Sequence, residues 1–173
     1  MMAEMSSAKE HLHTGGITGF VYHPDYEEHK PGFWHPECPE RVMVIKRAFD
    51  SLDTGNKAVL FSPRLAVEDE LKMVHTEQHV SLMHEMCAGG YYHAGMEADL
   101  NMQTWQAALR AAGAGIEASV KILSGEWVNA FCAGRPPGHH ATSNSAMGFC
   151  MFNNLAVAAA YLLKSGVDRI LIA

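Results

Sequence analysis

Two adjacent histidines, His139 and His140, end the run Arg-Pro-Pro-Gly-His-His at positions 135–140. Two prolines and a glycine make this a stiff turn, in which both rings cannot face a core. Imidazole has a reference pKa of about 6.5, so the pair can supply a base and an acid at neutral pH. The turn directly follows a predicted strand, and ligands bind at the carboxyl edge of open α/β sheets. A stiff loop with two exposed histidines is the alternative.

A second motif, Gly-Phe-Cys-Met-Phe-Asn-Asn, occupies positions 148–154. Gly148 permits a close backbone approach, and Phe149 follows it in a segment that leads into a predicted helix. Taken alone, such a segment is more often core than pocket wall. Its spacing from the histidine pair is what makes this motif a candidate for a functional role.

The cysteines and the charge balance limit the class of protein. Four cysteines occur, none in a C-x-x-C pair, and we expect reduced thiols in a cytoplasmic protein. Lys plus Arg is 13 and Asp plus Glu is 19, a net charge of −6, which argues against nucleic-acid binding and suits a cationic substrate. No apolar run approaches the roughly 20 residues of a membrane span. Residues 1–16 are predicted to be a flexible leader without the features of a signal peptide.

Strands and helices alternate along the rest of the chain, which predicts an α/β fold with a parallel sheet flanked by helices. Gly113 and Gly115 should weaken their helix by about 1 kcal/mol each unless close packing needs them, and Gly166 is a plausible helix C-cap. The predicted strands are 17–22, 57–61, 129–133 and 169–173, and the predicted helices are 39–52, 67–75, 76–87, 101–124 and 154–164.

Together the motifs resemble the histone deacetylase family. The turn at 135–140, eight intervening residues and then FCMFNN carry most of the likeness, which is to the class II branch with its bacterial deacetylase-like amidohydrolases and acetylpolyamine amidohydrolases. The likeness covers residues 18–173. Weaker matches are TGFVY at 18–22, HPECPER at 35–41 and VHTEQHV at 74–80, where His79 replaces the usual tyrosine.

The resemblance implies an arginase/deacetylase-like fold, of which this chain is the N-terminal portion, and a zinc-dependent amidohydrolase. In the family a zinc ion polarises the acetyl carbonyl and activates a water. His140 takes the role of the main general base and later acid, while His139 binds the same water and adds electrostatic stabilisation. In the family, each ring is normally oriented by a buried acidic partner.

Four further roles follow from the same resemblance. Gly148 and Phe149 would line the narrow channel for the acyl-bearing arm of the substrate. Arg41 would lie below the catalytic centre in the inner cavity through which acetate leaves. Asp99 would bind substrate at the pocket rim, where some relatives have an acidic residue. Histidines in the loops, His35 and His93 among them, are not assigned a role.

The family's zinc ligands are expected beyond Ala173, so residues 17–173 are interpreted as a domain truncated after its fourth strand, with no metal ligand of its own. Structural potassium ligands would also lie beyond it. The substrate is acetylated lysine or an acetylpolyamine, and a homo-oligomer is possible. A catalytically inactive fragment or partner-binding remnant is the alternative, and an arginase-type ureohydrolase ranks far behind. A reading frame that continues with Asp-x-Asp-x-His would favour the enzyme.

The family's strand order adds an expectation about the sheet. The first three strands should be neighbours, whereas 169–173 should lie further across, without a hydrogen-bonding neighbour. We therefore expect that segment to be the least protected apolar part of the chain and a cause of aggregation.

Overall fold

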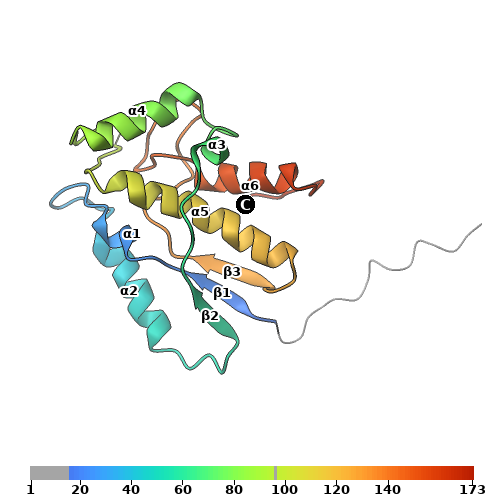
Figure 1. The fold of residues 1–173 in the computed structure, drawn as a ribbon. Coiled ribbons are helices and arrows are strands. Elements are labelled where there is room, and N and C mark those ends of the chain that lie inside the picture. The colour runs from blue at the N-terminus through green and yellow to red at the C-terminus, as the bar shows by residue number, and fades with distance from the viewer. Residues whose placement is uncertain (1–15, 96) are drawn as a thin grey trace, which may run out of the picture.

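A parallel three-stranded sheet forms the centre of the computed structural model, which describes residues 16–95 and 97–173 (Figure 1). The strand order is β2-β1-β3, so the α/β class and the adjacency of the first three strands are both confirmed. The predicted leader lies outside the described residues except for Gly16. The strands are β1 (Thr18–Val21), β2 (Ala58–Phe61) and β3 (Asn129–Cys132).

Six helices are found in the described residues, and two of them cover opposite faces of the sheet (Figure 1). Successive strand residues point to opposite faces. Phe20 accordingly stacks on Phe49 of α2 with ring centroids 4.0 Å apart, whereas Val21 packs against Ala114 and Ala118 of α5. The helices are α1 (Asp25–Glu28), α2 (Pro39–Asp50), α3 (Glu68–Leu71), α4 (Glu77–Ala88), α5 (Thr104–Leu123) and α6 (Asn154–Lys164).

The longest helix, α5, packs closely against its neighbours because it carries small residues. A Cβ on Gly113 would lie 2.1 Å from the carbonyl oxygen of Arg64, and a Cβ on Gly115 would lie 3.1 Å from the Cβ of Ala158 on α6. The helix-weakening glycines are therefore needed for packing. None of the described helices is both long and apolar enough to cross a bilayer.

Two local predictions are corrected. The segment after β1, for which no helix was predicted, contains α1, because its Tyr26 is fully buried and donates a hydrogen bond to the Arg110 carbonyl at 3.1 Å. The helix predicted over 67–75 is only the single turn α3. The next helix begins after Thr76, whose hydroxyl accepts a hydrogen bond from the His79 amide and so caps the helix.

The predicted fourth strand, 169–173, is also wrong as secondary structure. The chain turns at the end of α6 on Gly166, which has a φ of +94°, as the C-cap prediction required. Beyond it no strand is formed, and Leu171 and Ile172 are 90% and 56% exposed. An apolar segment becomes a strand only beside a hydrogen-bonded neighbour, and none of the described strands pairs with it.

Candidate active site

The tandem histidines lie just beyond the carboxyl end of β3, on a turn fixed by a buried thiol. The amides of His139 and His140 both donate to Cys150 Sγ at 3.4 Å, and the two ring centroids are 4.1 Å apart. Leu155, in the first turn of α6, donates its amide to the carbonyl of Gly138 at 3.1 Å. The backbone is thus held by buried and helical groups, while both rings stay exposed.

A pocket of about 390 Å³ opens in front of this turn. Its walls include His139, His140, Gly148, Phe149 and Arg41, so it brings together five of the six residues singled out from the sequence. The walls are completed by Glu37, Glu97, residues 131–135 at the end of β3, Pro137, and Val42 and Ile45 of α2.

Gly148 and Phe149 form a sharp bend against the second histidine. Both have left-handed backbone conformations, with φ of +54° and +66°. A Cβ on Gly148 would lie 2.7 Å from Cδ2 of His140, so only glycine lets this ring lie against the bend. The Phe149 amide donates to the carbonyl of Glu97 at 3.0 Å, which offsets the strain of a left-handed phenylalanine.

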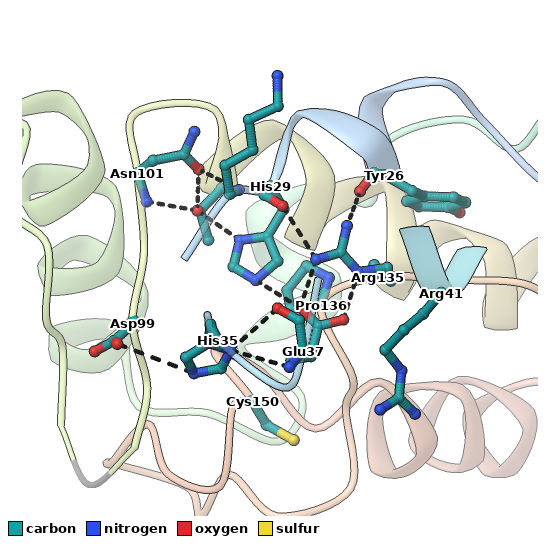
Figure 2. Close-up of polar contacts among 12 residues, drawn as sticks. Tyr26, His29, His35, Glu37, Arg41, Asp99, Asn101, Arg135, Pro136 and Cys150 are labelled. Carbon is teal, nitrogen blue, oxygen red and sulfur yellow. Dashed lines mark hydrogen bonds and ion pairs between the residues drawn. The ribbon is translucent and has the colours of Figure 1, made fainter. Parts of the chain in front are cut away.

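Behind the histidine turn lies a buried ion pair that the sequence analysis missed (Figure 2). Arg135 and Glu37 form a bidentate pair, in which Arg135 Nη2 lies 2.6 Å from Glu37 Oε2 and Nε also donates to Oε1. Arg135 donates further to the carbonyls of Tyr26, at 2.6 Å, and His29, at 3.1 Å. These contacts fix the first residue of the turn to α1 and to the segment before α2.

His29 extends this network to the start of α5. Its Nε2 lies 3.3 Å from Glu37 Oε2, and its Nδ1 lies 2.8 Å from Thr104 Oγ1. Burial lowers the pKa of His29, although Glu37 opposes the effect. Burial alone would raise the pKa of the Glu37 carboxyl, but hydrogen bonds from His29 and Arg135 hold it below its usual range. Glu37 is therefore ionised at neutral pH and balances the Arg135 cation.

Asp99 does not line the pocket. Its carboxylate lies 2.6 Å from Nδ1 of His93 and 4.0 Å from Nε2 of His35. The acidic residue that this loop contributes to the pocket wall is Glu97, two positions earlier. Its left-handed φ of +55° was not visible as a signal in the sequence.

A metal site is not formed by the described residues. Across 16–95 and 97–173 no group of three or more His, Cys, Asp or Glu side chains is arranged to hold a metal ion. Neither His139 nor His140 has a carboxylate within hydrogen-bonding distance in that part of the chain. The residues that the structure describes therefore do not by themselves fit a catalytic zinc site.

Comparison with known proteins places this chain in a family. Residues 35–173 match the histone deacetylase domain. The chain is 35% identical to a probable deacetylase of Archaeoglobus fulgidus, over 90% of this chain and 44% of that protein. It is 33% identical to the polyamine deacetylase HDAC10 of Homo sapiens, over 90% of this chain and 25% of that protein. The solved HDA15 HD domain superposes with a TM-score of 0.83 at 30% identity, covering 90% of this chain and 45% of that one.

The chain therefore belongs to the histone deacetylase family. It spans less than half of the length of each of these relatives, and what it contains is the N-terminal part of the domain.

Proposed function

We propose that this chain supplies the acid–base pair and the acyl channel of a zinc-dependent deacetylase, which removes acetyl groups from lysine or polyamine nitrogen. The observation that carries the proposal is the convergence of His139, His140, Gly148 and Phe149 on one pocket. The family membership supports deacetylase chemistry, whereas the metal and the substrate are our inference.

His140 is the residue we assign to proton transfer. It would take a proton from the water that attacks the acetyl carbonyl carbon, and return it to the nitrogen as the carbon–nitrogen bond breaks, which releases acetate and a free amine. His139 would hold the same water and stabilise the developing charge. Exposure of both rings to the pocket, on a backbone fixed by Cys150, supports these roles.

Gly148 and Phe149 are the channel residues in this proposal. A phenylalanine ring beside a glycine gives a flat apolar wall that suits a methylene chain. Arg41, on α2, lines the same pocket and is assigned to the inner cavity through which acetate leaves. Glu97 replaces Asp99 as the acidic residue we place at the channel wall. A cationic acylated amine is the class of substrate that this wall and the chain's net charge of −6 favour.

Zinc would be held by residues that the described part of this chain does not contain. The purified chain of 173 residues should accordingly hold no stoichiometric zinc and show no turnover. Metal analysis of the tag-free chain tests this expectation. One tightly held zinc per chain, lost when a pair of histidines is replaced, would contradict it.

The activity itself is tested with a chimera, in which residues 1–173 are followed by the remaining C-terminal part of the HDA15 HD domain. We expect this chimera to bind zinc and to hydrolyse an acetyl-lysine peptide or an N-acetylpolyamine. Comparison of the rates of hydrolysis of these two substrates identifies the substrate class. A folded, zinc-loaded chimera that hydrolyses neither would refute the proposal. Circular dichroism and zinc content separate that result from misfolding.

A non-catalytic, partner-binding remnant is the second candidate function. Turnover by a form of the natural protein would exclude this alternative.

A further inference from the structure

The ring of Phe149 is supported from behind by a histidine to which the sequence assigned no role. His35 and Phe149 meet edge to face, with ring centroids 4.8 Å apart and an interplanar angle of 78°. Edge-to-face pairs of this kind are a favoured aromatic geometry. The contact joins the segment before α2 to the bend beside His140. The orientation of Phe149 therefore depends on where His35 is held.

His35 is itself held on two sides (Figure 2). The Glu37 amide donates to its Nδ1 at 3.1 Å, and Nε2 lies 4.0 Å from Oδ2 of Asp99. Nδ1 also lies 3.0 Å from the Glu37 carbonyl oxygen, so the Glu37 backbone holds this edge of the ring in either tautomer, and Nε2 faces the Asp99 carboxylate. The side chain is only 12% exposed. A rotation of the ring would break one of these contacts.

The loop that carries Asp99 also holds the backbone of Phe149, through the hydrogen bond from its amide to the Glu97 carbonyl. One loop thus contacts the backbone of Phe149 directly and its ring by way of His35. In the same loop His93 binds the other oxygen of Asp99 at 2.6 Å. His93 therefore belongs to the same chain of contacts, and the control is His84, an exposed histidine on α4 whose ring stacks on Trp105.

We propose that Asp99 and His35 are positioning residues, in which Asp99 orients His35 and His35 sets the Phe149 ring that narrows the acyl channel. The role of the channel rests on the proposed function, but the positioning of Phe149 does not. Asp99 then acts through another residue instead of contacting substrate. The consequence is selectivity for a short acyl group.

The positioning is tested in the full 173-residue chain labelled with 4-fluorophenylalanine, whose Phe149 resonance is assigned with Phe149→Leu. We expect His35→Ala to shift and broaden this ¹⁹F resonance, and His35→Phe to restore a single sharp line because an aromatic edge is retained. His84→Ala should leave it in place. An unchanged Phe149 resonance in a folded His35→Ala variant would overturn the proposal.

A double-mutant comparison tests the order of the chain of contacts. Asp99→Ala should shift the Phe149 resonance in the wild-type background, and should have no further effect when His35 is already phenylalanine. An equal effect in both backgrounds would show that Asp99 does not act through His35, and would overturn the proposal that Asp99 orients His35.

The selectivity is measured in the zinc-loaded chimera with acetyl-lysine and butanoyl-lysine peptides. Apolar pockets discriminate by roughly 10–200-fold per methylene. We expect His35→Ala to reduce the ratio of kcat/KM for acetyl over butanoyl by about tenfold, chiefly through KM, and His35→Phe to restore it. A shifted ¹⁹F resonance with an unchanged ratio would refute the assignment of Phe149 as the selecting wall, and leave the positioning intact.

Discussion

Acid should destabilise this protein through a pair of buried histidines, His75 and His79, which contact the backbone of Asn153 and Met151. His75 is 3% exposed, and its Nε2 accepts a hydrogen bond from the Asn153 amide at 2.9 Å. Its ring lies 5.1 Å from that of His79, and within the described part of the chain neither ring has a hydrogen-bond partner at Nδ1. Burial, with a smaller effect from His79, lowers the pKa of His75 from 6.5 to about 4. Burial also lowers the pKa of His79.

The size of the effect follows from the two pKa values of His75. Between pH 6.5 and 4 the unfolded chain binds a proton that the folded chain refuses, so the free energy of unfolding falls as the pH falls. For this one group the loss is about 2 kcal/mol between pH 7.5 and pH 5, and approaches about 3 kcal/mol below pH 4. The contribution of neutral His75 to the free energy of unfolding is fully present above pH 6.5.

Urea unfolding of the wild type and of His75→Gln at pH 7.5 and pH 5.0 measures this. The glutamine oxygen accepts from the Asn153 amide but does not titrate. Between pH 7.5 and pH 5.0 we expect the free energy of unfolding to fall by about 2 kcal/mol more in the wild type than in the variant. The exposed His84→Gln serves as the control and should keep the wild-type dependence. Equal losses in the wild type and in His75→Gln would refute this reasoning.

Three further outcomes are expected. Glu37→Gln should destabilise the chain by about 3–5 kcal/mol, because it leaves the buried Arg135 cation unbalanced, and a loss below 1 kcal/mol in urea unfolding would contradict the buried pair. Gly148→Ala in the chimera should lower kcat by about tenfold or more, because the new Cβ would lie 2.7 Å from Cδ2 of His140 and push the ring out of position. Full activity of this variant would mean that the bend tolerates a side chain. Amides 170–173 should exchange within seconds, and slow hydrogen exchange there would show that this segment has found a strand partner.

The sheet and the longest helix were predictable because their patterns are local. The β-forming run at 17–22 and the three- and four-residue spacing of apolar residues on α5 encode burial directly. The segment 169–173 has the same apolar character, yet it forms no strand, because pairing depends on residues elsewhere in the chain. The turn of α1 was missed because a single buried tyrosine is its only apolar anchor.

The site was predictable where one short motif carries it. His139 and His140 are adjacent, and their position after a strand is visible without a structure. Arg135 and Glu37 lie 98 residues apart, so no local sequence pattern indicates that they form an ion pair. The exchange of Asp99 for Glu97 on the pocket wall has a similar cause, because loop geometry decides which of two nearby carboxylates faces inward.

The central claim is that His140 performs proton transfer in the pocket, and the turnover number of the zinc-loaded chimera tests it most directly. With zinc content and circular dichroism unchanged, His140→Ala should lower kcat by about 10²–10⁴-fold, and His139→Ala should lower it less. Near-wild-type turnover by a zinc-loaded His140→Ala chimera would contradict the account.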